Sequence, residues 1–122
     1  MELSLSEVER IVQVSRYQVS RYAKDCLIKR TRQGHYDAAS LAKVYPPFNK
    51  WACMGQDIDE ERAVWLVRVQ HFIHRELLKI INKRHQDEHK GYGRHDISAT
   101  EKRDIDKTVN DFVAIAAALP NR

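Results

Sequence analysis

The feature that most limits how this chain can fold is an apolar stripe running through residues 58–88. Its members recur at intervals of three and four residues, as one face of an α-helix requires: Leu66, Val69, Ile73, Leu77 and Ile80, broadened by Trp65, Phe72 and Ile81. A helix from Ile58 to Glu88 would be about 46 Å long at about 1.5 Å per residue. The N-terminal segment is too short to cover such a helix alone. The stripe therefore needs another partner, either the C-terminal helix or a second chain.

A second long helix is predicted near the C-terminus. Residues 98–101 read SATE, the S-x-x-E form of a capping box, and an apolar face follows them: Ile105, Val109, Phe112, Ala116 and Leu119. Gly91 and Gly93 interrupt the helical pattern between the two long segments. We predict that residues 57–120 form a helical hairpin or dimer element with heptad-like packing. This region is the expected oligomerisation element, with a homo-oligomer formed through residues 58–119.

Two short helices are predicted at the N-terminus. Residues 4–7, SLSE, form another capping box, and the apolar spacing behind it predicts a helix over residues 5–13. Residues 15–18, SRYQ, cap a second helix only two residues later, which runs to Lys24 and buries Val19, Tyr22 and Ala23. Two short helices joined this closely form a helix-turn-helix pattern.

A small β-wing is predicted after the second helix. The apolar pair Leu27 and Ile28 closes that helix onto a basic segment, residues 29–33, and Gly34 permits the turn that follows. The predicted fold class is therefore mainly α with a small β-wing. An N-terminal winged helix-turn-helix domain occupies residues 1–50, and the long helices follow it.

A third short helix is predicted between the wing and the long helices. Asp37 is its expected N-cap, and the helix would run over residues 38–45 with Leu41 and Val44 facing inward. Pro46 and Pro47 end it, because neither proline can donate a backbone hydrogen bond. Residues 46–56 form the expected connector, pinned to a core by Phe48, Trp51 and Met54.

Basic residues are concentrated in the first half of the chain. The formal net charge is +4, and residues 1–50 hold nine Lys/Arg against five Asp/Glu, so that the remainder is neutral. Within this half, residues 14–36 place six bases against the single acid Asp25: Arg16, Arg21, Lys24, Lys29, Arg30 and Arg32. A positive field confined to a helix-turn-helix pattern and a wing favours double-stranded DNA as the partner over a merely solvated face.

The residues on this surface divide between base reading and phosphate binding. Those on the second helix can offer donors to base edges in the major groove: Arg16, Gln18, Ser20 and Arg21. Those at the wing are placed to hold the DNA backbone: Lys29, Arg30 and Arg32. Tyr22 is expected in the core, because its spacing from Val19 is that of the buried face.

The same stretch resembles a known family. The MerR-type winged helix has a pattern that is similar to Val14-Ser15, Val19, Tyr22 and Leu27-Ile28, followed by Gly34, Tyr36-Asp37 and Leu41. The resemblance covers about residues 5–45, and small phage excisionases and terminase small subunits share this kind of domain. It departs at Cys26, where the family usually has a helix-ending glycine, and in its short wing. The resemblance implies DNA contacts at Arg16, Tyr17, Arg21, Lys24, Arg30, Arg32 and His35.

Histidines suggest a competing metal site on the long helix. His71 and His74 are three residues apart, and His85 and His89 are four apart, so each pair could face one way, near Asp87, Glu88 and His95. However, the H-x-x-x-H pair lacks a glutamate beside its first histidine, and most such pairs are solvated. We therefore expect no metal and no other cofactor.

Other classes of protein fit the sequence poorly. No serine or cysteine nucleophile stands in a recognisable motif with a histidine and a carboxylate, and no glycine-rich phosphate loop exists with 4 Gly. Cys26 and Cys53 are too few for a disulfide framework. The N-terminus lacks the basic and apolar regions of a signal peptide, and apolar runs such as VAIAAAL are far short of a membrane span. A non-enzymatic cytoplasmic protein is expected.

Three functions are compatible with these observations. The first is a sequence-dependent double-stranded DNA-binding protein, a bacterial or phage transcription regulator that acts as a dimer or higher oligomer. The second is a phage terminase small subunit, which recognises viral DNA for packaging. The third is a protein-interaction adaptor in which the long helices hold a partner and the basic half is incidental.

Overall fold

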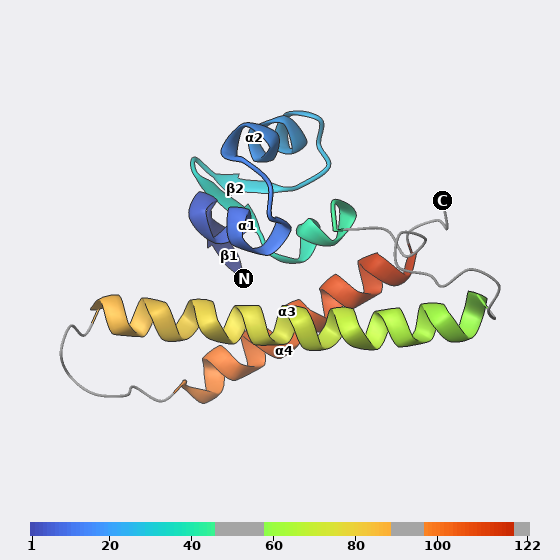
Figure 1. Ribbon diagram of the computed structural model, residues 1–122. Coiled ribbons are helices and arrows are strands. Elements are labelled where there is room, and N and C mark those ends of the chain that lie inside the picture. Colours follow the sequence, from blue (N-terminus) through green and yellow to red (C-terminus); the bar gives the residue numbers. More distant parts are fainter. Residues whose placement is uncertain (46–57, 89–96, 119–122) are drawn as a thin grey trace.

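The computed structural model describes residues 1–45, 58–88 and 97–118. The protein is mainly helical and has a small three-stranded antiparallel sheet (Figure 1). The elements in chain order are β1 (Glu2–Ser4), α1 (Leu5–Val12), α2 (Arg16–Lys24), β2 (Arg30–Arg32), β3 (His35–Asp37), the 3₁₀-helix η1 (Ala39–Lys43), α3 (Ile58–Glu88) and α4 (Ala99–Ala118). The three helices predicted at residues 5–13, 15–24 and 58–88 are confirmed.

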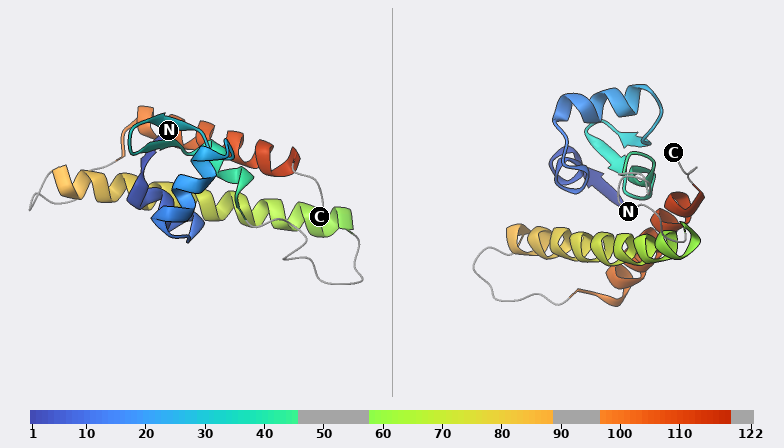
Figure 2. Two further views of the ribbon diagram at one scale, coloured as in Figure 1. Left: turned by 90° about the horizontal axis from the view of Figure 1, so that it is seen from above. Right: turned by 45° about the vertical axis from the view of Figure 1, so that its right-hand side comes forward.

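The elements are arranged in two levels. In Figure 1, α2 lies above α1 and the sheet, and α3 and α4 cross below them. The helix α4 runs back across α3 in the opposite direction (Figure 2), and both long helices contact N-terminal elements, α3 through α1 and α4 through η1. The long helices therefore form one side of the molecule, and α2 lies on the other.

Three serine caps fix where the helices begin. Ser4 Oγ accepts a hydrogen bond from the backbone N–H of Glu7 at 3.4 Å, and the Glu7 carboxylate accepts one from the Ser4 N–H at 2.8 Å. Ser15 Oγ likewise accepts from the Gln18 N–H at 3.4 Å. Ser98 and Glu101 form a reciprocal box with two bonds of 3.1 Å. Each cap satisfies donors that would otherwise be unpaired at a helix N-terminus, so the predicted starts are confirmed.

The sheet contains one strand that was not predicted. Its order is β1-β3-β2, and β1 pairs with β3 so that Glu2 lies opposite Asp37 and Leu3 opposite Tyr36. The prediction that Asp37 caps a helix is therefore wrong, because this residue belongs to a strand. The helix predicted over residues 38–45 is a five-residue 3₁₀-helix that begins after Ala38. Ser40 ties it to the hairpin: its Oγ donates to the carbonyl of Asp37 at 2.7 Å and accepts from the Lys29 N–H at 2.9 Å.

Helix α2 ends in a Schellman motif that contains Cys26 in place of a glycine. The N–H of Leu27 donates to the carbonyl of Tyr22 at 2.9 Å, and the N–H of Cys26 donates to that of Ala23 at 3.1 Å. Cys26 has a φ of 59°, in the left-handed region. The chain therefore keeps the helix-ending turn that a glycine would favour, but holds a side chain in a conformation that strains it.

We expect Cys26→Gly to raise the free energy of unfolding by about 0.5–1 kcal/mol. Relief of the left-handed strain, about 1–2 kcal/mol, is partly offset by the greater freedom of glycine in the unfolded chain. Urea denaturation measures the difference. Cys26→Ala is the matched control, because it removes the thiol without changing the strain. A gain from Cys26→Ala as large as that from Cys26→Gly would contradict the explanation.

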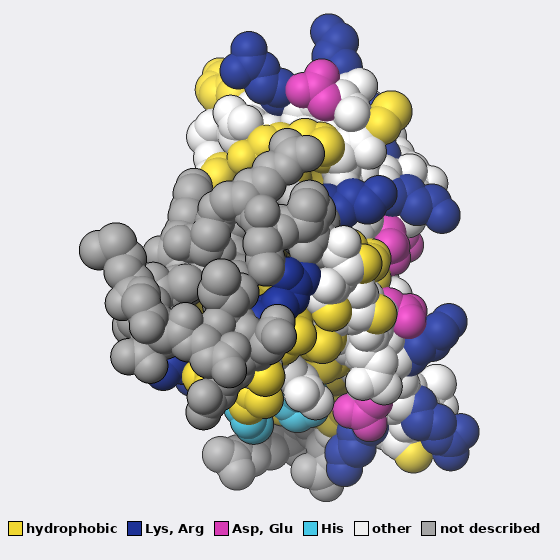
Figure 3. Space-filling view, turned by 90° about the vertical axis from the view of Figure 1, so that its right-hand side faces the viewer, with side chains coloured by type: hydrophobic (Ala, Val, Ile, Leu, Met, Phe, Trp, Pro, Cys, Tyr) yellow, Lys and Arg dark blue, Asp and Glu magenta, His cyan; other side chains and the backbone are white. Residues whose placement is uncertain are grey.

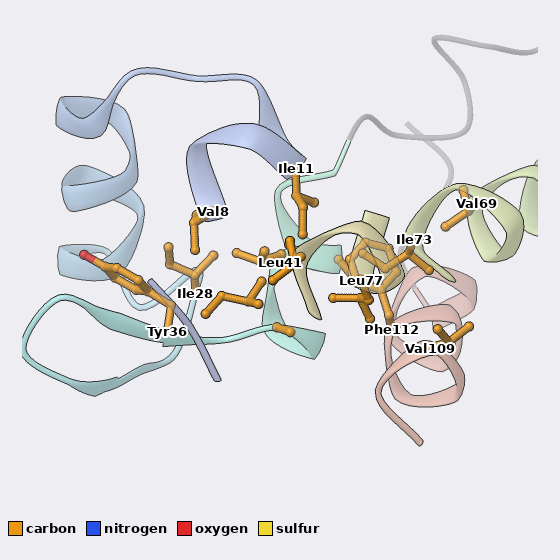
Figure 4. Packing of buried hydrophobic residues seen from close by; sticks show 14 of the residues in the cluster. Val8, Ile11, Ile28, Tyr36, Leu41, Val69, Ile73, Leu77, Val109 and Phe112 are labelled. Atoms are coloured by element: carbon orange, nitrogen blue, oxygen red, sulfur yellow. The ribbon is translucent and has the colours of Figure 1, made fainter. Parts of the chain in front are cut away.

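Buried hydrophobic side chains form one continuous cluster that joins both levels of the molecule. It extends from Leu3 in β1 to Ala116 in α4, and Figure 4 shows Leu41 between Val8 and Ile28 on one side and Leu77 and Phe112 on the other. The stripe of α3 packs against α4 and α1, and η1 packs against α4. Within the described part of the chain, the C-terminal helix and the N-terminal elements cover the stripe. The sequence had predicted either that helix or a second chain as its partner. Oligomerisation through residues 58–119 stays a prediction.

Some predicted features lie outside the described residues. These are the connector at residues 46–56, with its three apolar anchors and both prolines, the glycine break at Gly91 and Gly93, Leu119, and the residues Cys53, His89 and His95. Among the helices that the structure does describe, none combines the length and the apolar character needed to cross a membrane.

Candidate nucleic-acid interface

The outer face of α2 carries the side chains predicted to read DNA. Val19 is fully buried on the inner face and fixes the orientation of the helix. The opposite face is open to solvent, with Tyr17 83% exposed and the others also exposed: Arg16, Ser20, Arg21 and Lys24. Gln18 is half-buried, and its backbone N–H is used by the Ser15 cap. Five of the six α2 residues proposed from the sequence thus share an accessible surface.

The β2–β3 hairpin presents a second set of predicted residues. All three residues of β2 are exposed, and two of them are Arg30 and Arg32. Lys29 is also exposed at its side chain, while its backbone is held by Ser40. His35 is half-buried in β3, where its Nδ1 lies 3.1 Å from the carbonyl oxygen of Gln33. The turn between the strands is made by Gly34 at a φ of 73°.

The helix and the hairpin both belong to the N-terminal part of the molecule but lie at different depths in it. Figure 1 shows α2 at the end away from the crossing long helices, whereas the hairpin lies nearer to them, and its residues Arg32 and His35 line a pocket with Arg84 of α3. In the space-filling view of Figure 3, Lys and Arg side chains project from the top of the molecule, the end that α2 forms in Figure 1. The two predicted sets of basic residues are therefore both exposed in the N-terminal part of the molecule, the α2 set at its outer end and the hairpin set nearer to the long helices.

Two acidic partners of this surface were missed by the sequence reasoning. The Glu2 carboxylate accepts hydrogen bonds from Thr31 Oγ1 at 2.7 Å and Arg32 Nε at 2.8 Å, so it reaches across β3 to the hairpin edge. These two bonds hold the pKa of Glu2 below its ordinary value. Glu9 lies 3.8 Å from Arg16 in an ion pair. Neither acid could be assigned from spacing, because each partner is brought close only by the fold.

Below this surface, Arg84 joins α3 to the N-terminal elements. Its Nε and Nη2 donate to the two carboxylate oxygens of Glu7 at 2.9 and 2.6 Å, and Nη2 also donates to the Glu2 carbonyl at 2.9 Å. Burial opposes ionisation of Glu7, but hydrogen bonds from Arg84 and the Ser4 N–H outweigh it and lower its pKa. The hydrogen bonds to Glu7 raise the pKa of Arg84.

Two histidines of α3 pair with acids of α4. His85 Nε2 lies 2.9 Å from Glu101 Oε2, and His74 Nε2 lies 3.8 Å from Asp106 Oδ1. The backbone N–H of Ser98 and then the His85 ring lower the pKa of Glu101. Across residues 1–45, 58–88 and 97–118, no three His, Cys, Asp or Glu side chains are grouped closely enough to hold a metal ion. These contacts tie two helices together.

No protein-family model matches this chain, and comparison with the curated proteins and the solved structures found no match. What bears on function is therefore the surface formed by α2 and the hairpin, together with the charges around it.

Proposed function

We propose that the protein binds double-stranded DNA in a sequence-dependent way through a winged helix-turn-helix formed by α1, α2 and the β2–β3 hairpin. We further propose that it is a bacterial or phage transcription regulator. The observation that carries the proposal is the division of α2 into two faces, one packed on the core through Val19 and one fully accessible and basic. A short helix of this kind, joined closely to another, can enter the major groove with its outer face toward the bases.

Base reading is assigned to residues near the start of α2. An arginine can donate two hydrogen bonds to the O6 and N7 atoms of guanine, which suits Arg16 and Arg21. Ser20 can contact bases from the same face, and Gln18, which is half-buried beside it, can contact adenine. Arg16 is 67% exposed at its side chain, and its 3.8 Å ion pair with Glu9 is long enough to be exchanged for a base contact at little cost.

Phosphate binding is assigned to the hairpin and to the end of α2. Lys24, Lys29 and Arg30 are exposed and carry charge without sequence information. Glu2 holds the Arg32 side chain along the hairpin edge, while that side chain stays 66% exposed. Tyr17 and His35 can add polar contacts to sugar or phosphate.

A dimer or higher oligomer is part of the proposal. Two-fold assemblies place two recognition helices on half-sites about one helical turn apart, which raises affinity and specificity. Among the described residues of α3, Val64 and Val67 remain 48% and 52% exposed and could meet a second copy. Light scattering of the protein at high concentration tests this part, and a monomer mass would remove it.

We expect Arg21→Ala to weaken binding to a selected DNA site by about 5-fold to 150-fold, equivalent to about 1–3 kcal/mol for a lost base contact. The site is first enriched from a random duplex library, and affinities are then measured by fluorescence anisotropy. Arg103→Ala on α4 is the matched control, since Arg103 is an exposed helical arginine outside the proposed surface. Equal affinity of wild type and Arg21→Ala for every duplex would disprove the DNA-reading role of α2.

A further inference from the structure

The charges of α3 are segregated along the helix. Residues 62–86 contain six Lys/Arg and one acid, Glu76, while the acids that balance them in the sequence lie before residue 62 and after residue 86. Glu76 is buried, with 8% of its surface exposed. The neutral total of the second half of the chain therefore conceals a strongly basic helix surface.

Four of these bases form an exposed strip along one flank of α3. We call this strip the α3 flank: Arg68, Arg75, Lys79 and Lys83. Their spacing of seven, four and four residues keeps them on one side of the helix and extends over about 22 Å of its length. Lys79 and Lys83 stand 3.5 and 3.8 Å from Glu76 and Asp87, contacts that leave both lysine side chains exposed.

Ion pairs connect the α3 flank to the surface around α2. Glu76 lies between two bases, 3.1 Å from Arg10 of α1 and 3.5 Å from Lys79, so these two cations are neighbours. Arg10 follows Glu9, which pairs with Arg16 at the start of α2. A basic track therefore leads from α2 over the end of α1 and onto α3.

We propose that this track binds the phosphate backbone of the same duplex that α2 contacts, so that α3 extends the DNA interface beyond the helix-turn-helix. The inference rests on the proposed function and adds a second contact surface to it. Basic residues lie on three elements, and those of the α3 flank extend over about 22 Å of the helix. This distribution suits a polyanion with one charge about every 1.7 Å better than it suits a single small anion. The flank is also a poor surface for self-association, since a second copy would bring like charges together.

The test removes three charges from the flank and compares the result with a matched variant. Arg68→Gln/Arg75→Gln/Lys79→Gln is the flank variant, and Lys102→Gln/Arg103→Gln/Lys107→Gln on exposed positions of α4 is the control. Both have a formal net charge of +1 in place of +4. Glutamine preserves helix propensity, and circular dichroism verifies folding. Binding to the selected duplex is measured by anisotropy between about 50 and 200 mM salt, which brackets physiological ionic strength.

We expect the flank variant to have a salt slope smaller by about 2.7, at about 0.9 for each lost phosphate contact. Wild type should then lose about 40-fold more affinity than the flank variant over this salt range. The control should keep the wild-type slope, and the flank variant should keep the wild-type preference among duplexes. Sedimentation of the complex in excess duplex should show no more than one duplex per chain.

The outcomes separate this inference from the proposed function. If the flank variant and the α4 control have the same slope while Arg21→Ala loses its site, the flank does not bind DNA and the proposed function stands. If Arg21→Ala changes nothing while the flank variant loses affinity, the DNA-reading role of α2 fails and α3 is the phosphate-binding surface. Two duplexes per chain would overturn the assignment to a single duplex. Failure of wild type to bind any duplex would remove both proposals.

Discussion

Phe112→Ala is expected to lower the free energy of unfolding by about 3–5 kcal/mol, the range for removing a fully buried phenylalanine from a core. The side chain is 0% exposed and belongs to the cluster that joins α3, α4 and η1. Its ring also meets the ring of Tyr45 at a centroid distance of 5.7 Å in an edge-on arrangement. Alanine would leave a cavity at the point where the long helices contact the N-terminal elements, so the whole protein should be destabilised.

Equilibrium unfolding in urea, followed by circular dichroism, measures this loss. Val67→Ala is the control, because Val67 is a hydrophobic residue of α3 that is 52% exposed, and its truncation should change stability by less than about 0.5 kcal/mol. A loss below about 1 kcal/mol for Phe112→Ala would mean that this core is not packed as the structure shows.

The features that were predicted correctly are encoded by residues close together in the sequence. A cap such as Ser4 or Ser98 acts on an N–H three residues away, so a short motif is enough to predict where the helix begins. The apolar stripe of α3 repeats over many turns, and its bounds could therefore be read directly. The exposed face of α2 followed from the same periodicity.

The features that were missed depend on residues far apart in the sequence. The strand β1 is three residues long and exists because Leu3 lies opposite Tyr36. That pairing also places Asp37 in a strand. The sequence had suggested a helix cap at this residue, because an acid precedes an alanine-rich stretch. Local patterns cannot encode such pairing, because its register is set by the burial of one face of the sheet.

The candidate site shows the same division between local and distant information. Its exposed bases were identified from composition, whereas the carboxylates of Glu2 and Glu9 that hold two of them were not. The α3 flank was missed for a different reason. The net charge of the second half of the chain is zero, although the bases and most of the acids of α3 lie in different parts of the helix. Charge counted along one helix face describes a binding surface better than charge counted over a domain.

Arg84→Met is expected to lower the free energy of unfolding by about 2–3 kcal/mol at neutral pH. The substitution removes three hydrogen bonds, two to the Glu7 carboxylate and one to the Glu2 carbonyl, and leaves Glu7 without its cation. Breaking a fully buried ion pair costs about 3–5 kcal/mol, and the cost is smaller here because the Arg84 side chain is 38% exposed. Methionine keeps the length of the aliphatic stem, so packing of this side chain against the N-terminal elements is largely preserved.

The pH dependence distinguishes the ion pair from a packing defect. The pKa of Glu7 is lower in the folded protein than in the unfolded chain, where it is about 4.3. The stability contributed by the ionised carboxylate is therefore fully present above the unfolded pKa and is lost as the pH falls through the folded pKa. The difference in stability between wild type and Arg84→Met should therefore be constant near neutral pH and shrink below about pH 4. Lys83→Met, whose ion pair with Asp87 is exposed on both sides, should cost less than about 0.5 kcal/mol. A difference between wild type and Arg84→Met that stays the same down to pH 3 would assign the loss to packing and not to the Glu7 carboxylate.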